Sequence, residues 1–474
     1  MKLLRLLSPF LAFGIAYGLL GPFEGRLVGA VFAATVLLWI TELLPHAMTA
    51  LLSTAALVII AGIDEKKAFG AYGDPIIPLF IGSFILAKSM ETSRLNDRFA
   101  WLILSRPWAT RSPSAMLLAL GILTCTISLF VSNTATTAMF LPIGLSMISA
   151  LPKERHLFPV GVMLMLTWGS SVAVGVPVGT PPNLIALAEI EKVTGVNITF
   201  GQWMAFGMPI TVFMLMAAWL ILKLCYGRRA PQTVGAQHIA VDRLKEMGPL
   251  RNSERNVLIA FGTAFALWVI PDMAAVALGS THIAAKWLQT HIPASVAALI
   301  GAALPFVLPC KDKEEQMTWK LATKIDWGTI LLFGGGIALG QAMFSSGLAK
   351  DLGQLAANSS GAHSLWAITA LVTAASILLS ELASNTAAAT TLIPMAIGLA
   401  QGAGVSPIAP ALGVAIGSSL GFMLPVSTAP NAIVYSSGLV PPKEMMKAGI
   451  MLDVIGFFIT LAGLWLILPR LGLG

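Results

Sequence analysis

Long runs of apolar residues alternate with short polar segments along nearly the whole chain. Most of these runs have about the 20 residues that an α-helix needs to cross a bilayer. We expect membrane-spanning helices over residues 3–20, 27–44, 46–62, 75–91, 203–224, 254–271, 293–309, 327–345 and 449–469.

Two further apolar runs, residues 114–151 and 364–401, are too long for one helix and tight for two helices and a turn. The same polar triplet stands near the midpoint of each run: Ser132, Asn133 and Thr134 in the first, and Ser384, Asn385 and Thr386 in the second. We expect each run to form a re-entrant helical hairpin, with the triplet at its tip.

Proline interrupts two other apolar runs, residues 157–188 and 407–437. The breaks fall at residues 177–182 and 425–430. Because proline lacks an N–H and clashes with the preceding turn, the helix must open there. Each run is therefore expected to be one span with an unwound centre.

These features recur in the same order at an offset of about 250 residues. Residues 79–95 resemble 332–348, residues 132–142 resemble 384–394, and residues 177–185 resemble 425–433. The chain is therefore predicted to be a duplication of residues 27–226 and 254–470, preceded by one extra helix. Each half has five spans and one hairpin, and an odd number of spans inverts the second half. The predicted fold is an all-α polytopic membrane protein with eleven transmembrane helices in an inverted repeat.

Composition agrees with this pattern. Of the 474 residues, 56% are hydrophobic and 11% are charged, whereas soluble domains have about 25% charged residues. The first 21 residues resemble a signal peptide but lack a small-residue cleavage site, so we expect a membrane helix there. Cys125, Cys225 and Cys310 have neither disulfide nor metal spacing.

The net charge of +7 is better explained by basic cytoplasmic loops than by nucleic-acid binding. With the N-terminus inside, most of the 29 Lys and Arg residues fall on the inner side, as the positive-inside rule requires. We expect a multi-pass protein of the cell membrane, which in a bacterium is the inner or plasma membrane. Its N-terminus is expected in the cytoplasm and its C-terminus outside.

The polar breaks are candidate binding sites. Half-helix N-termini present free N–H groups and a positive dipole end to an anion. Unwound carbonyls and hydroxyls suit a cation such as Na⁺. Ser128 and Ser380 lie one helical turn before their triplets and face the same tips. Since neither hairpin contains Lys or Arg, dipoles, hydroxyls and coupled cations would hold the anion.

Each of these motifs, taken alone, also has a structural explanation. A lone SNT triplet commonly makes an interhelical contact or a cap, and Thr180 suits an N-cap. The duplication favours a binding site. Glu381, the only charge in the second hairpin, is expected to pack or hydrogen-bond near the tip rather than ligate a cation. The triple glycine at 334–336 indicates close helix packing rather than a phosphate loop.

The paired SNT motifs and the segments PVGTPPN and PVSTAPN, residues 177–183 and 425–431, resemble the divalent anion/sodium symporter family of di- and tricarboxylate carriers. The resemblance covers nearly the whole chain. It implies a homodimer in which a transport domain moves against a scaffold domain in elevator fashion. It also implies succinate, malate or fumarate as substrate, sometimes citrate or sulfate.

The resemblance divides the chain into parts and assigns the site. Residues 1–113 and 254–361 would form the scaffold, residues 114–226 and 362–474 the transport domain, and residues 227–253 a cytoplasmic linker. The substrate would contact Ser132, Asn133, Thr134, Thr180, Ser384, Asn385, Thr386 and Thr428. One Na⁺ would bind Ser128, Ser132, Asn133 and Gly179; the other would bind Ser380, Ala383, Asn385 and Ser427.

Two details bear on these implications. The second loop has Ala429 where the family usually has proline, which affects the geometry at Thr428. The first motif continues as SNTATTAM, residues 132–139, which resembles the cotransporters rather than the exchangers.

The function expected is sodium-coupled uptake of a C4-dicarboxylate, with no enzymatic activity. Proton coupling, anion exchange, citrate or sulfate as substrate, and a channel are the open alternatives. An intramembrane hydrolase would need a membrane Asp pair, a metal motif or a Ser with a base. The six His residues lie near span ends or in loops, and no Asp is expected inside a span.

Overall fold

The computed structural model describes residues 2–21, 23–149, 157–227, 234–279, 281–311, 316–360 and 364–474. Within these ranges the chain is helical and has no β-strand, which confirms the all-α class. Part of the predicted linker and the basic residues Lys153, Arg155, Arg228, Arg229 and Lys313 lie outside the described residues.

Helices of the first half follow the apolar runs. They are α1 (Lys2–Leu19), α2 (Arg26–Thr41), α3 (His46–Ile59), α4 (Glu65–Gly70), α5 (Ile76–Ser93), α6 (Leu95–Leu104), α7 (Pro107–Thr110), α8 (Pro113–Ser128), α9 (Asn133–Ser149), α10 (Phe158–Ser171), α11 (Pro181–Thr194) and α12 (Phe200–Leu222). Short η1 (Ala71–Gly73) and η2 (Pro177–Gly179) precede α5 and α11, and a π-helical turn, η3 (Lys223–Gly227), extends α12.

The second half repeats this order after α13 (Val234–Glu246), in the linker region. Its helices are α14 (Asn252–Leu278), α15 (Ile283–His291), α16 (Ala294–Val307), α17 (Trp319–Ala322), α18 (Trp327–Ser345), α19 (Leu348–Ser360), α20 (Leu365–Leu382), α21 (Asn385–Gly402), α22 (Ile408–Gly417), α23 (Ala429–Ser436) and α24 (Pro442–Ile467), with η5 (Leu468–Leu471) at the end.

Six described helices or helix combinations are long and apolar enough to cross a membrane: Glu65–Ser93, Phe200–Gly227, Asn252–Leu278, Trp327–Ser345, Leu365–Leu382 and Pro442–Leu471. A seventh is the pair α15 and α16, bent by 66° where Pro293 begins a new helix. The sequence predicted only the second member of that pair. The predicted spans near α1, α2 and α3 are present as shorter apolar helices.

The halves pack in a matching way. Helix α3 packs against α18, and α16 packs against α5. Both contacts use a glycine: Gly335 faces Ala50, and Gly82 faces Ala298. A side chain at either glycine would overlap the facing helix, so these helices approach at backbone distance. Gly336 likewise faces Thr390, which confirms that the triple glycine serves packing.

Each SNT triplet separates two helices that pack together: α8 from α9, and α20 from α21. Gly121 of α8 faces Met165 of α10, and one turn further along both helices Thr124 faces Gly169. Helices α8 and α10 therefore run parallel. The start of α8 lies at the C-terminal end of α12, where the Trp219 indole donates to the Ser114 carbonyl at 2.8 Å. The chain therefore turns back at the first triplet before α10 begins.

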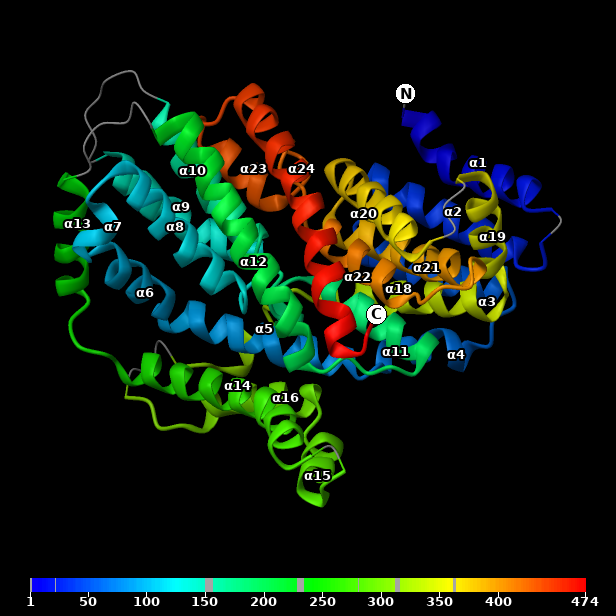
Figure 1. The fold of residues 1–474 in the computed structure, drawn as a ribbon, viewed down its shortest axis with the longest axis horizontal. Helices are drawn as coiled ribbons and strands as arrows, with labels where there is room; N and C mark the ends of the chain where they lie inside the picture. Colours follow the sequence, from blue (N-terminus) through cyan, green and yellow to red (C-terminus); the bar gives the residue numbers. More distant parts are fainter. Residues whose placement is uncertain are drawn as a thin grey trace.

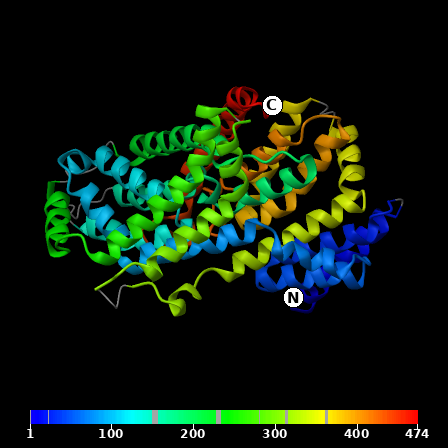
Figure 2. The same cartoon turned by 90° about the horizontal axis from the view of Figure 1, so that it is seen from below.

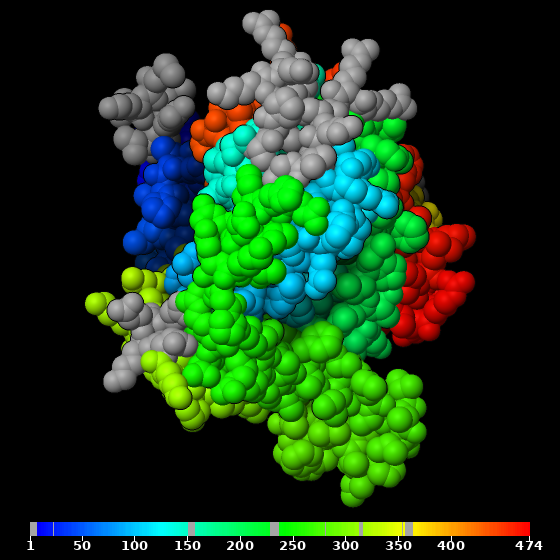
Figure 3. Space-filling view, turned by 90° about the vertical axis from the view of Figure 1, so that its left-hand side faces the viewer, coloured from blue at the N-terminus to red at the C-terminus, as the bar shows by residue number. Residues whose placement is uncertain are grey.

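The molecule is elongated, with the N-terminal helices beside α18–α21 at one end and α6–α9 with α13 at the other (Figures 1 and 2). Helices α14–α16 project from one side (Figure 1). Viewed from the end, α13 lies over α6 and α7, against which it packs (Figure 3).

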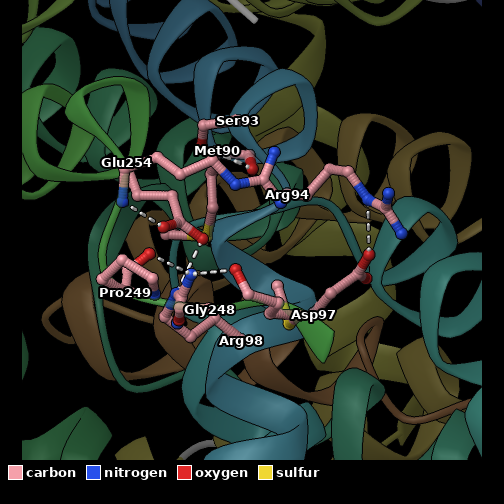
Figure 4. Close-up of polar contacts among 10 residues, drawn as sticks. Met90, Ser93, Arg94, Asp97, Arg98, Gly248, Pro249 and Glu254 are labelled. Carbon is pink, nitrogen blue, oxygen red and sulfur yellow. Dashed lines mark hydrogen bonds and ion pairs between the residues drawn. The ribbon is translucent and has the colours of Figure 1, made fainter. Parts of the chain in front are cut away.

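An arginine joins the linker region to the first half. The Arg98 guanidinium contacts the Glu254 carboxylate at 2.8 Å and donates to the carbonyls of Gly248 and Pro249 at 2.8 and 3.0 Å (Figure 4). The Glu254 side chain is fully buried. This contact holds the start of α14 on α6.

Candidate functional site

The N-termini of four helices border the same cavity. Helices α9 and α21 begin at the two SNT triplets, and α11 and α23 begin at the two proline-rich breaks. The N–H groups of a first helical turn have no partner within their helix. A region where four such turns converge is positive without any cationic side chain.

The two triplets have the same local geometry. Ser132 Oγ accepts the Ala135 N–H at 3.3 Å, and Ser384 Oγ accepts the Ala387 N–H at 3.2 Å, so each Ser caps its helix. Ser128 Oγ donates to Asn133 Oδ1 at 2.8 Å. Ser380 Oγ makes the matching contact with Asn385 Oδ1 at 2.9 Å.

A cavity of about 850 Å³ lies between these ends. Ser128 and Ser380 are fully buried behind it and do not line it. All other predicted site residues line the cavity: Ser132, Asn133, Thr134, Gly179, Thr180, Ala383, Ser384, Asn385, Thr386, Ser427 and Thr428.

The described lining residues include no Lys or Arg. Glu42, His46 and Asp326 contribute to the wall from α2, α3 and the start of α18. The cavity therefore offers hydroxyls, amides and helix N-termini, together with the carboxyls of Glu42 and Asp326 and the His46 imidazole. These groups can hold a small anion by hydrogen bonds and a hard cation by oxygen atoms.

The two threonines after the breaks differ slightly. Thr428 Oγ1 accepts the Asn431 N–H at 3.2 Å and caps α23, so Ala429 in place of proline is compatible with a capped helix start. Thr180 makes no side-chain cap. Its hydroxyl lies 3.4 Å from that of Ser419 in the other half.

Two asparagines that sequence reasoning did not assign hold the breaks open. Asn183 Nδ2 donates to the Val174 and Val176 carbonyls at 3.2 and 3.0 Å. Asn431 Nδ2 donates to the Gly421 and Leu424 carbonyls at 2.9 and 3.0 Å. The signal was present, because both residues end the repeated segments PVGTPPN and PVSTAPN.

Glu381 lies beside the second tip. Its carboxylate accepts the backbone N–H groups of Met423 and Leu424 at 2.9 and 3.1 Å. It therefore hydrogen-bonds as the sequence predicted, and the bonds stabilise the opened chain before α23. The expectation that no Asp lies inside a span is wrong: Asp453 is buried within α24, where it faces Glu381.

Comparison with known proteins defines the family. The family model described as "Sodium:sulfate symporter transmembrane region" matches residues 19–470. The chain belongs to this sodium:sulfate symporter family. The family membership and the long apolar helices together make it a multi-pass membrane protein, and they agree with the resemblance found from the SNT motifs.

Relatives of this symporter extend over most of its length. The chain is 31% identical over 467 residues to a protein from Staphylococcus aureus named "Sodium-dependent dicarboxylate transporter SdcS", covering 94% of this chain and 87% of the relative. A protein of the same name from Staphylococcus saprophyticus is 30% identical over 446 residues, covering 91% and 84%.

Solved structures of transporters share the fold at low identity. The YdaH transporter of Alcanivorax borkumensis aligns with a TM-score of 0.61 at 14% identity, covering 91% of this chain and 98% of that one. MtrF of Neisseria gonorrhoeae aligns with a TM-score of 0.57 at 13% identity, covering 88% and 85%.

Proposed function

We propose that this symporter imports C4-dicarboxylates such as succinate, malate or fumarate together with Na⁺. The observation that carries the proposal is the convergence of four helix N-termini on a cavity whose described walls hold no Lys or Arg. A dicarboxylate brings two negative charges that the helix ends only partly balance. Coupled cations supply the rest, and the relatives named sodium-dependent dicarboxylate transporters support this assignment.

The substrate binds between the two tips. Its carboxylates contact the hydroxyls and amides of the triplets and of the residues after the breaks, which are Ser132, Asn133, Thr134, Thr180, Ser384, Asn385, Thr386 and Thr428. All of them line the cavity.

Each tip also holds one Na⁺. The first ion binds Ser128, Ser132, Asn133 and the Gly179 carbonyl. The second binds Ser380, Asn385 and the carbonyls of Ala383 and Ser427. Because each Asn carboxamide serves the ion and borders the anion, sodium binding assembles the anion site.

We propose an elevator movement with the division given by the sequence. The scaffold comprises residues 1–113 and 254–361, the transport domain residues 114–226 and 362–474, and the linker residues 227–253. The α8–α9 and α20–α21 pairs are re-entrant hairpins of an inverted repeat with eleven spans. The matching contacts of α3 with α18 and α16 with α5 support this repeat.

The symporter works as a homodimer with a cytoplasmic N-terminus and an external C-terminus. Asp326 lines the cavity and also borders the C-terminal part of α5 at Lys88 and Glu91. The Arg98–Glu254 contact lies just beyond that end of α5. If the basic linker is cytoplasmic, the cavity opens inward, and the structure represents an inward-facing state.

The deciding experiment is uptake of labelled succinate by proteoliposomes under separate Na⁺ and H⁺ gradients. We expect uptake that requires the Na⁺ gradient and collapses in Asn133→Ala and in Asn385→Ala. Glu91→Gln, a change at an exposed residue of a local ion pair, is the matched control. Full uptake in either Asn variant, or uptake driven by H⁺ alone, would contradict the proposal.

Sulfate is the second candidate substrate, because the family description names it. Competition by succinate, citrate, glutamate and sulfate in the same assay separates the possibilities. Saturable uptake driven by a gradient excludes a channel, and flux that requires a counter-anion on the other side would show exchange instead.

A further inference from the structure

Two glycines one turn apart on α18 face helices of the proposed transport domain. Gly336 faces Thr390 of α21, and Gly340 faces Glu189 of α11. A Cβ at Gly340 would lie 2.9 Å from Oε2 and 3.0 Å from Oε1 of Glu189. Helix α11 packs against both α18 and α21 (Figure 1). The Glu189 carboxyl therefore lies in the boundary between the two proposed domains, directly against the backbone of α18.

This carboxyl is buried without a hydrogen-bond partner. Glu189 is 1% exposed, and neither of its oxygens has a partner among the described residues. Burying an ionised carboxylate without a partner costs far more free energy than burying the neutral acid. The observed packing of α11 on α18 therefore favours the protonated form of Glu189.

The charged groups around Glu189 do not change that preference. Helix α11 packs most closely against α18, α21, α22 and η2, and these elements contain no ionisable side chain. The other charged residues of α11 are Glu191 and Lys192. Glu191 is exposed and accepts from the Asn197 amide. The Lys192 ammonium is 2.7 Å from the carboxylate of Asp74. The cation nearest to Glu189 along the helix is thus already paired with the scaffold.

Movement at the boundary would change both carboxyls together. An elevator movement separates Glu189 from Gly340 and Lys192 from Asp74. Side chains three positions apart on a helix are neighbours, so the released Lys192 ammonium can pair with Glu189, and water can reach the carboxyl. The Glu189 O–H bond then breaks, its proton passes to water, and the carboxylate is left. Return to the observed state takes one proton back from water.

We propose that Glu189 is a proton-binding site in the boundary between scaffold and transport domain, and that the bound proton stabilises the observed state. Lys192 exchanges Asp74 for Glu189 when that proton leaves. Because the observed state binds the proton more tightly, low pH favours it and high pH favours the other state. The inference rests on the proposed elevator movement, and it requires neither a particular substrate nor sodium coupling.

A second contact across the same boundary provides a reporter of the observed state. The Asp272 carboxylate of α14 accepts the Gly201 N–H of α12 at 2.7 Å. A Cβ at Gly201 would lie 3.3 Å from the Asp272 Cβ, close to the spacing of about 3.5–4.5 Å in disulfides. In a variant without the native cysteines, Gly201→Cys with Asp272→Cys should therefore form a disulfide quickly in the observed state and slowly in the other.

The first test measures how fast this disulfide forms in purified protein at about pH 6 and about pH 8, where an exposed glutamate is already ionised. Sodium and succinate are left out. Each rate is divided by that of the same protein with Glu189→Gln, whose amide stays neutral, because thiol ionisation changes all variants equally. We expect this ratio to fall about threefold or more from the lower to the higher pH.

Matched variants assign the fall to Glu189. Glu191→Gln removes the exposed neighbouring carboxylate of the same helix and should leave the fall unchanged. Glu189→Leu, a second neutral variant, should keep a constant ratio to Glu189→Gln at both pH values. A ratio that does not change with pH in the parent, or a fall that disappears in Glu191→Gln, would overturn the inference.

The second test observes the proton directly in the disulfide-linked protein, which is held in the observed state. At about pH 6, infrared spectroscopy should show a deuterium-sensitive carboxylic acid C=O band. This band should lose a component in Glu189→Gln and keep it in Glu191→Gln. An unchanged band in Glu189→Gln would contradict a bound proton. If succinate uptake proves independent of sodium, the proposed function fails, while both tests still decide whether Glu189 binds a proton.

Discussion

Asn431 shows how single side chains hold the site together. Its amide donates to two carbonyls of the non-helical segment between α22 and α23. Its Oδ1 accepts the hydroxyl of Thr167, which belongs to the other half, at 2.7 Å. Asn183, its counterpart, makes the two carbonyl bonds, but its Oδ1 has no partner among the described residues. The reason is local: Ala415 stands at the position that corresponds to Thr167.

Removing the Thr167 hydroxyl should therefore weaken the contact between the halves. We expect Thr167→Val to lower the free energy of unfolding by about 1 kcal/mol, the usual net value of a buried hydrogen bond. The measurement is the thermal midpoint of the purified protein in detergent. Thr369→Val, which removes a bond within one helix, is the control and should have the smaller effect. Equal effects would mean that the Thr167–Asn431 bond adds nothing across the halves.

At the scale of elements, the binding cavity depends on where helices begin. Proline and the SNT triplets interrupt apolar segments, and the four helices that begin there line one cavity with their first residues. Away from the site, the elements are joined by a few polar contacts, of which Arg98 with Glu254 is the most buried ion pair among the described residues.

Arg98→Ala should detach the start of α14 from α6. Breaking a buried ion pair leaves an uncompensated charge and costs about 3–5 kcal/mol, although the Arg251 N–H still reaches Glu254. We expect a clearly lower thermal midpoint and faster trypsin cleavage in the 234–251 region. Arg94→Ala, which removes an exposed pair with Asp97, should cost only about 0–1 kcal/mol. Indistinguishable variants would contradict a structural role for the buried pair.

At the scale of the whole molecule, one ion pair among the described residues crosses the proposed boundary between scaffold and transport domain. The Lys192 ammonium of α11 lies 2.7 Å from the carboxylate of Asp74, which precedes α5. An elevator movement must separate or displace these two residues.

Cross-linking tests that boundary. In a variant without Cys125, Cys225 and Cys310, we expect a cross-link between Asp74→Cys and Lys192→Cys to stop succinate uptake, and a reducing agent to restore it. Tyr226→Cys with Glu444→Cys is the matched control, because those side chains touch at 2.9 Å within the proposed transport domain. That cross-link should leave uptake unchanged. Continued uptake with Asp74 and Lys192 joined would rule out movement at this boundary.

The sequence by itself determined most of the long helices, the two tips and the two breaks. These are local properties: apolar runs set helix length, proline opens a helix, and a polar triplet in an apolar run marks a turn. The internal repeat also paired Asn133 with Asn385 and Thr180 with Thr428, and all four line one cavity. The family assignment came from the same residues.

Only the tertiary structure decided which distant side chains meet. Thr167 and Asn431 are 264 residues apart, and no periodicity indicates that they form a bond. Asp453 lies inside the predicted span 449–469, so the sequence alone already places this acid in a span. What the sequence does not show is that α20, which carries Glu381, packs against α24, which carries Asp453. Sequence fixes what each segment can form, whereas packing fixes which polar groups must satisfy one another.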